Sequence, residues 1–84
     1  MGQLTYESVL RDTVELIERH LPEPVAVKES SEFKGDLNFD SIGIMDLIAD
    51  IEDHFDVTIP LNDLPRMQTV KQTAERLLVL AGNR

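Results

Sequence analysis

Residues 41–55, SIGIMDLIADIEDHF, determine how this chain folds. Their large apolar side chains recur every three or four positions, the spacing of a single helix face, at Ile44, Leu47, Ile48, Ile51 and Phe55. This spacing predicts a helix over residues 41–54. Residues 57–60, VTIP, follow, and β-branched residues before a proline favour extended backbone. The helix is therefore expected to end before Val57.

A second amphipathic helix is predicted near the N-terminus. Thr5 can cap its first turn, and Pro22 cannot continue it. Its apolar positions approximate the same helical spacing: Tyr6, Val9, Leu10, Val14, Leu16, Ile17 and Leu21. Residues 22–40 then form a long polar connection, and in so small a domain such a connection is usually functional.

The C-terminal part of the chain is expected to add one short and one longer helix. Residues 61–67 have room only for a short turn of helix. The longer helix should start at Thr69, where Gln72 completes a capping box, and stop at Gly82. Its apolar face consists of Val70, Ala74, Leu77, Leu78 and Ala81. The sequence thus predicts an all-α four-helix bundle, three longer helices plus one short helix, with a long loop between helices 1 and 2.

We expect one domain over residues 1–84, because a chain of this length supports a single small core. The predicted core combines the helix faces with Phe33 from the long connection: Leu10, Val14, Phe33, Ile44, Leu47, Ile48, Ile51, Phe55, Ile59, Leu64, Met67 and Val70. Any apolar cavity in such a core should be small or should open on demand.

The net charge of −8 is confined to one segment. Residues 36–63 contain eight acids and no Lys or Arg, whereas the rest of the chain has eight acids and eight bases. Such a surface repels nucleic acid, since phosphate binding requires clustered Lys and Arg. It attracts basic patches on partner proteins.

Composition excludes several other kinds of site. The chain has no cysteine, so neither a disulfide nor a thiolate metal site can form. No apolar run approaches the ~20 residues of a membrane span, and the N-terminus lacks the order of a signal peptide, so a cytoplasmic protein is expected. Asp36, Asn38 and Asp40 are spaced like the start of a calcium loop. Because Ser41 and Leu47 stand where that loop requires Gly and Glu, no metal site is expected.

His20 and His54 are the only histidines, and nothing in the sequence couples either to a nucleophile. The chain also lacks a Ser-His-Asp order and a glycine-rich phosphate loop. No intrinsic catalysis is therefore expected.

Residues 33–60, FKGDLNFDSIGIMDLIADIEDHFDVTIP, resemble the signature region of the acyl carrier proteins. They contain the aspartate-leucine pair Asp36-Leu37, then Asp-Ser plus an aliphatic residue, an acidic-aliphatic helix ending in EDHF, and a closing Ile-Pro. The resemblance continues to residues 69–70 and more loosely over the whole chain. Residues 43–48, GIMDLI, and 59–62, IPLN, are similar to specialised bacterial carriers outside the housekeeping fatty-acid set.

The resemblance implies that Ser41 carries a 4'-phosphopantetheine arm, transferred from coenzyme A by a phosphopantetheinyl transferase, with Asp40 as the adjacent motif residue. The arm's terminal thiol would hold an acyl group as a thioester, although the chain itself has no cysteine. A phosphodiester beside open N–H groups at a helix N-terminus is also electrostatically favourable. Taken alone, Ser41 is more simply a helix cap, and it is the surrounding pattern that favours attachment.

The acidic residues in and around the helix predicted over residues 41–54 are candidates for docking partner enzymes. Asp46, Asp50 and Asp53 follow i, i+4, i+7 spacing and so lie on one helix face. Like charges at this spacing destabilise a helix. An acidic face without Lys or Arg that begins at Ser41 therefore favours partner binding over a merely solvated surface. The resemblance implies that acyl-transferring or condensing enzymes recognise this helix through basic patches. The predicted docking residues are Asp40, Asp46, Asp50, Glu52, Asp53 and Asp56. Gly43 and Asp50 differ from the better-known fatty-acid carriers, which commonly have an acid two residues after the serine.

A helical bundle can admit an alkyl chain between its helices, where each buried methylene contributes ~0.8 kcal/mol. The predicted contacts of such a chain are Ile51, Ile59 and Met67. The main hypothesis is a monomeric carrier that presents acyl intermediates to enzymes of fatty-acid or specialised lipid biosynthesis. Two alternatives remain open: a carrier of aminoacyl or polyketide units, and a module that binds partners non-covalently through its acidic helix.

Overall fold

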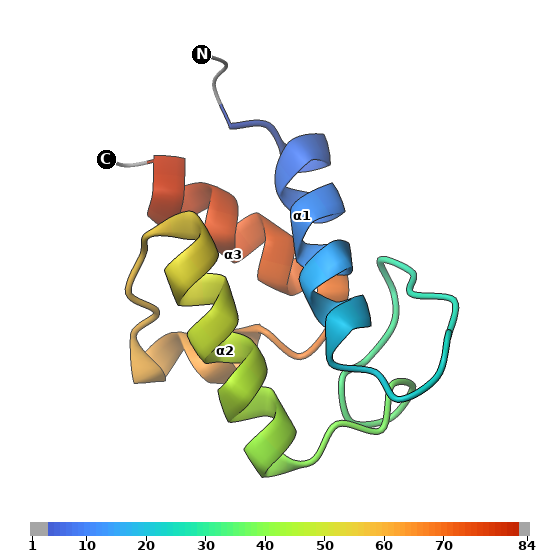
Figure 1. Cartoon of the computed structure of the whole chain (residues 1–84). Helices are drawn as coiled ribbons and strands as arrows, with labels where there is room; N and C mark the ends of the chain where they lie inside the picture. The colour runs from blue at the N-terminus through green and yellow to red at the C-terminus, as the bar shows by residue number, and fades with distance from the viewer. Residues whose placement is uncertain (1–3, 83–84) are drawn as a thin grey trace.

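The computed structural model describes residues 4–82, and this part of the chain contains four helices. They are α1 (Tyr6–Arg19), α2 (Ser41–Phe55), the short 3₁₀ helix η1 (Leu61–Arg66) and α3 (Val70–Gly82) (Figure 1). Helix α1 packs against both α2 and α3. The predicted all-α bundle, with its long loop before α2, is confirmed. None of the described helices is long and apolar enough to cross a membrane.

The start of α1 is fixed by the predicted cap, Thr5. Its hydroxyl accepts a hydrogen bond from the Ser8 N–H at 3.1 Å, and the Ser8 hydroxyl accepts one from the Thr5 N–H at 3.1 Å. This reciprocal pair satisfies donors that the first helical turn leaves open. The helix ends at Arg19, with His20 as its C-cap, so Pro22 lies just outside it.

The observed ends of α2 and α3 differ slightly from the predicted ones. Helix α2 extends one residue further than expected, to Phe55, and Asp56 closes it in the left-handed region at φ 55°. Helix α3 follows the predicted capping box, in which Thr69 and Gln72 exchange two hydrogen bonds of 3.1 Å. Gly82 is the last residue of α3, as predicted, and its backbone is not left-handed.

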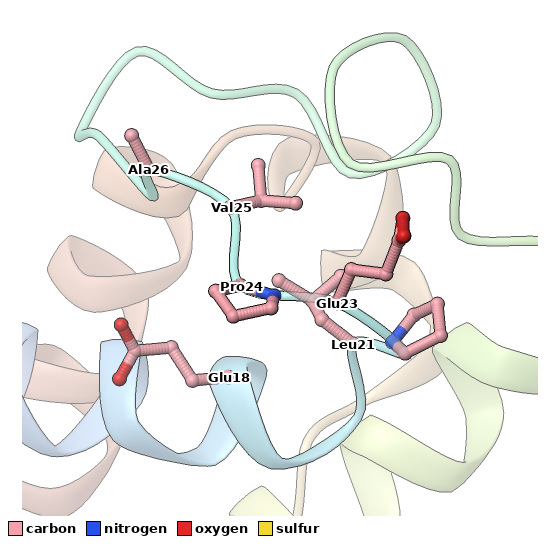
Figure 2. A pocket seen from close by; sticks show the side chains of 7 residues that line it. Glu18, Leu21, Glu23, Pro24, Val25 and Ala26 are labelled. Atoms are coloured by element: carbon pink, nitrogen blue, oxygen red, sulfur yellow. The ribbon is translucent and has the colours of Figure 1, made fainter.

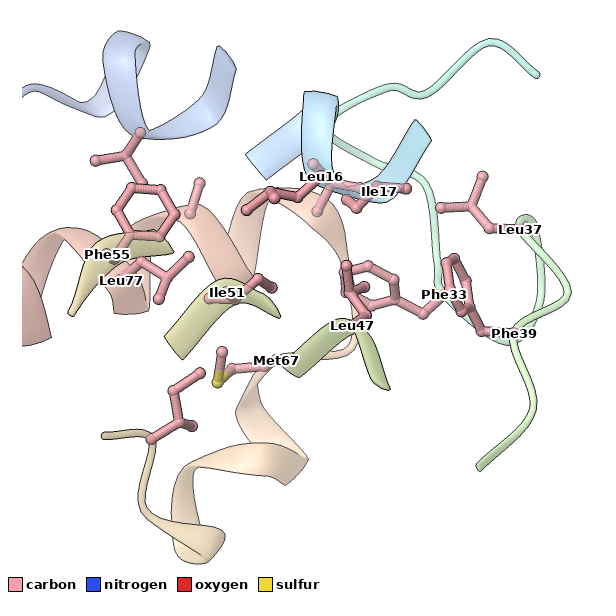
Figure 3. Close-up of a cluster of buried hydrophobic side chains, with 14 residues drawn as sticks. Leu16, Ile17, Phe33, Leu37, Phe39, Leu47, Ile51, Phe55, Met67 and Leu77 are labelled. Atoms are coloured by element: carbon pink, nitrogen blue, oxygen red, sulfur yellow. The ribbon is translucent and has the colours of Figure 1, made fainter. Parts of the chain in front are cut away.

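One continuous apolar core lies between the helices (Figure 3). Most of the predicted core is fully buried, namely Phe33, Leu47, Ile51, Phe55, Ile59, Met67 and Val70. The remaining predicted members are half-buried and pack against it: Leu10, Val14, Ile44, Ile48 and Leu64. The core also contains Leu37 and Phe39 from the long connection, which were not predicted there.

The connection between α1 and α2 is tied to the segment that leads into α3. The Phe33 N–H donates to the Gln68 carbonyl at 3.1 Å, and the Val70 N–H donates to the Ser31 carbonyl at 3.0 Å. In Figure 1 this connection loops out beside the C-terminal end of α1 before it returns to the start of α2. Because both bonds are made by the backbone, its returning half is a fixed part of the fold.

An ion pair holds η1 against α3. Arg76 Nε lies 2.9 Å from Asp63 Oδ2, and the Asp63 side chain is only 9% exposed. A carboxylate this well buried needs such a partner, because removing one member of a buried pair leaves an uncompensated charge. The short helix therefore has a defined position beside α2 and α3.

We predict that the Tyr6 phenol titrates far above its ordinary range. Burial, the hydrogen bond to the Glu29 carboxylate, and the charges of Glu29 and Glu75 raise the pKa of Tyr6 from 10.0 to about 12. A raised pKa favours the protonated phenol in the folded chain, so its contribution to stability is complete below pH 10.0 and is lost as pH rises through about 12. Ultraviolet absorbance can follow this step, because the chain has one tyrosine and no tryptophan.

The Glu29→Gln variant is the control for the tyrosine titration. It should lower the midpoint but leave it above 10.0, because burial, the largest cause of the shift, remains. A midpoint near 10.0 in the folded wild-type chain would contradict the assignment.

Candidate functional site

Ser41 is the first residue of α2 and is exposed. Asp40 precedes it as the N-cap, with its Oδ1 accepting a hydrogen bond from the Gly43 N–H at 2.7 Å and its carbonyl accepting one from the Ile44 N–H at 2.9 Å. The cap therefore uses Asp40 and leaves the serine side chain free. No hydrogen bond to the Ser41 hydroxyl is found within residues 4–82.

A closed turn places Asp40 and Ser41 at the edge of the core. The Phe39 N–H donates to the Phe33 carbonyl at 2.8 Å, which brings the two ends of the turn together. Both rings are buried and meet edge to face, with centroids 5.9 Å apart. Asn38 turns the chain at φ 58°, a left-handed conformation that Asn tolerates better than most residues. Because Phe39 is fixed, α2 begins at a defined point.

An apolar hollow of about 610 Å³ begins at Ser41. It is bounded by α2, by η1 and by the turn, and its apolar lining includes Ile44, Met45, Leu47, Ile48, Leu61, Leu64 and Met67. Its polar lining includes Glu32, Lys34 and Gln68. A hollow of this volume is in the usual range for ligand sites, and it is open at the surface and not enclosed within the core.

The structure separates the three predicted cargo contacts. Met67 lines the hollow, whereas Ile51 and Ile59 do not. Ile51 is 1% exposed and Ile59 6%, and both belong to the central core. Figure 3 shows Ile51 among Leu47, Met67 and Leu77 within this core. The sequence analysis did not predict that η1 side chains line the hollow. A lining shared by α2 and η1 depends on how the two helices pack, which periodicity does not reveal.

Two of the predicted docking acids are free on the surface of α2. Asp46 and Asp53 are exposed, and neither makes a hydrogen bond or ion pair with another residue of the described chain. Asp50 is different, because its Oδ2 lies 2.6 Å from His20 Nε2 at the end of α1. The i, i+4, i+7 set therefore offers two unengaged carboxylates and one that also ties α2 to α1.

The remaining predicted docking acids act at ends of secondary structure. Glu52 Oε2 accepts a hydrogen bond from the Ile59 N–H at 2.7 Å, which fixes the extended segment before η1. Asp56 is the left-handed C-cap of α2, and Asp40 is its N-cap. These three side chains lie on or next to α2, but each has a structural position as well as a charge.

The two histidines each pair with an acid, and neither forms a hydrogen bond with the Ser41 hydroxyl. His54 Nε2 lies 3.3 Å from Asp12 Oδ2, a second link between α2 and α1. His20 makes the corresponding link to Asp50. Within residues 4–82 no group of three or more His, Asp or Glu side chains is arranged to hold a metal ion.

A second hollow, of about 450 Å³, lies where α1 leads into the long connection (Figure 2). Its lining comes from Glu18 and residues 21–26, including two prolines. None of the predicted site residues lines it. The hollow at Ser41, by contrast, is lined by two of the predicted site residues, Ser41 and Met67.

Comparison with known proteins identifies the family of this chain. A family model described as a phosphopantetheine attachment site matches residues 9–77. An acyl carrier protein from an Exiguobacterium species is 35% identical over 68 residues, covering 80% of this chain and 86% of the relative. The chain belongs to the acyl carrier protein family. Its cofactor is covalently attached 4'-phosphopantetheine, and proteins of this family are carriers rather than catalysts.

Two further members of the comparison agree with this assignment. An acyl carrier protein from Lactobacillus johnsonii is 32% identical over 73 residues, covering 86% of this chain and 91% of the relative. A solved chain from Mycobacterium tuberculosis, described as a candidate acyl carrier protein, superimposes with a TM-score of 0.79 at 27% identity. That match covers 84% of this chain and 96% of the solved one.

The side chains at the candidate site around Ser41 are compatible with a phosphopantetheine group attached to a serine. The Ser41 hydroxyl is exposed and unpaired within the described residues, so a modifying enzyme can reach it. The apolar hollow begins at the same residue, which gives a flexible attached chain a surface to lie against. The side chains present are therefore compatible with the group that the family carries.

Gly43 has a packing reason to lack a side chain. A Cβ at this position would lie 3.1 Å from Asp40 Oδ1 and 3.2 Å from a ring carbon of Phe39. A longer acidic side chain would push on both the helix cap and the buried ring. These neighbouring side chains would have to shift by a few tenths of an ångström to accept a residue larger than glycine.

We predict that Asp40→Ala destabilises the chain by about 0.5–2 kcal/mol, the usual cost of losing an N-cap. Asp40→Asn should cost clearly less, because an amide oxygen can accept the Gly43 N–H in the same way. Urea unfolding followed by circular dichroism measures both values. Equal losses for the two variants would show that the carboxylate charge, rather than the cap hydrogen bond, stabilises this end of α2.

Proposed function

We propose that Ser41 Oγ is the attachment atom for the 4'-phosphopantetheine arm of this carrier. The single observation that supports this most directly is the exposed, unpaired hydroxyl at the mouth of an apolar hollow. The matched family region, residues 9–77, includes Ser41. When attached, the arm supplies a thiol for thioester formation, which the chain lacks because it has no cysteine.

The residues around Ser41 would prepare it for this role. Asp40 holds the first turn of α2 in place, so the serine projects from a rigid element. Open backbone N–H groups and the helix dipole favour negative charge at the same point, which suits a phosphodiester. The fixed turn behind Phe39 prevents the site from moving into the core.

The cargo that this hollow supports best is an alkyl chain of fatty-acid or specialised lipid biosynthesis. Its lining is mainly aliphatic, and Met67 adds a flexible, polarisable side chain. Transfer of each methylene from water into such a lining contributes ~0.8 kcal/mol. Ile51 and Ile59 support the wall from inside the core, so direct contact is proposed for Met67 but not for these two. An aminoacyl unit would make less use of so apolar a surface.

Partner enzymes would dock on α2 through basic patches, with Asp46 and Asp53 as the first points of contact. These two carboxylates are exposed and unengaged within the described chain, and they lie on the helix that starts at Ser41. Asp40, Asp50, Glu52 and Asp56 would add to the negative field even though they also stabilise the fold. The partners are the phosphopantetheinyl transferase and acyl-transferring or condensing enzymes.

The attachment site is tested by intact mass after incubation with coenzyme A and a broad-specificity phosphopantetheinyl transferase. Wild type and Ser30→Ala should each gain one phosphopantetheine, because Ser30 is an exposed serine outside the hollow. Ser41→Ala should gain none, while its unfolding free energy changes by less than about 0.5 kcal/mol. Absence of addition to folded wild type, with the transferase active on a control carrier, would favour the non-covalent interaction module instead.

The docking residues are tested by the kinetics of the same modification. Asp46→Asn and Asp53→Asn should each lower kcat/KM of the transferase for this carrier by about 1.5- to 5-fold, the range for single exposed ion pairs. Added salt should reduce the difference. Glu15→Gln removes the same charge from α1 and should have little effect. An equal loss in all three variants would mean that overall charge, not the α2 surface, guides the encounter.

A further inference from the structure

Lys34 is the single basic residue among those that line the hollow at Ser41. Its side chain is exposed and makes no ion pair with any residue of the described chain. Just after it, residues 36–63 contain eight acids and no Lys or Arg. A lysine at the entrance of this hollow therefore presents an unused positive charge beside the candidate attachment serine.

The closed turn brings Lys34 and Ser41 to the same place. The Phe33 carbonyl, directly before Lys34, accepts the Phe39 N–H at 2.8 Å, and Phe39 is two residues before Ser41. Phe33 is also fixed from its other side by the 3.1 Å bond from its N–H to Gln68. The backbone of Lys34 is thus held at one edge of the hollow, and its long, flexible side chain can reach over the opening.

Two of the acids near Lys34 in sequence, Asp36 and Asp40, already accept backbone hydrogen bonds. Asp36 Oδ2 accepts the Glu32 N–H at 2.8 Å, and Asp40 Oδ1 accepts the Gly43 N–H at 2.7 Å. Glu32 also lines the hollow, but it forms no ion pair with Lys34. An arm attached to Ser41 would bring a further anion, its phosphodiester, to the lining that Lys34 and Ser41 share.

We propose that Lys34 is a positioning residue whose ammonium group pairs with the phosphodiester of the arm. This inference rests on the proposed function, because it requires attachment at Ser41. Holding the phosphate on the Lys34 side of Ser41 directs the arm across the opening of the hollow instead of outward into solvent. Lys34 thereby favours the state in which the apolar cargo lies against the hollow.

The test is phosphorus NMR of the holo-protein, with intact mass first establishing that one arm is attached. Lys34→Gln should shift and narrow the phosphodiester resonance, since the ratio of docked to free arm falls by about 1.5- to 5-fold on loss of an exposed ion pair. Lys34→Arg keeps the charge and should retain the wild-type resonance. Lys71→Gln removes an exposed lysine outside the hollow and should leave the resonance unchanged.

The salt dependence of the phosphodiester resonance is a second readout. It would be absent if Lys34 had only a structural role. Raising the ionic strength should move the wild-type resonance toward that of Lys34→Gln and leave the variant almost unmoved, because screening weakens an exposed pair. Identical resonances for wild type and Lys34→Gln, on proteins that carry the arm, would overturn the positioning role alone. Failure of wild type to gain an arm at Ser41 would overturn the proposed attachment and this inference together.

Discussion

The hydrogen bond from the Phe39 N–H to the Phe33 carbonyl is the constraint on which the candidate site depends. It closes the turn before α2, and the buried rings of the same two residues anchor that turn in the core. Asp40 can cap α2 only because the chain reaches it at a fixed point. The position of Ser41, and of the hollow that begins there, follows from this closure.

The acids of α2 would repel one another if they were all solvated on one face, and the structure reduces this cost by engaging several of them. Asp50 pairs with His20 across the interface with α1, and Glu52 satisfies a backbone donor of the next segment. Asp46 and Asp53 keep their charge available at the surface. One acidic helix can thus contribute to folding and still present charge to a partner.

Most of the fold could be predicted because its signals are local. Helical periodicity and capping residues such as Thr5 and Thr69 act within a few positions, so the helices and their starts followed from the sequence. Tertiary packing, in contrast, determines that Phe39 is buried in the core. It also determines that the hollow lies outside Ile51 and is not lined by it. The partner of Glu52 also depends on tertiary packing, because its carboxylate accepts from the Ile59 N–H, seven residues later on an irregular segment, and such a spacing leaves no periodic pattern.

The bond between Glu52 and the Ile59 N–H makes recognition at this residue a competition. A partner arginine that binds both carboxylate oxygens displaces the part-buried Ile59 N–H, whereas one that binds Oε1 alone leaves that hydrogen bond in place. Binding at Asp46 or Asp53 carries no such cost, because neither has a partner in the described chain to give up. Carboxylates of equal charge along α2 can therefore contribute different amounts to the affinity for a partner enzyme.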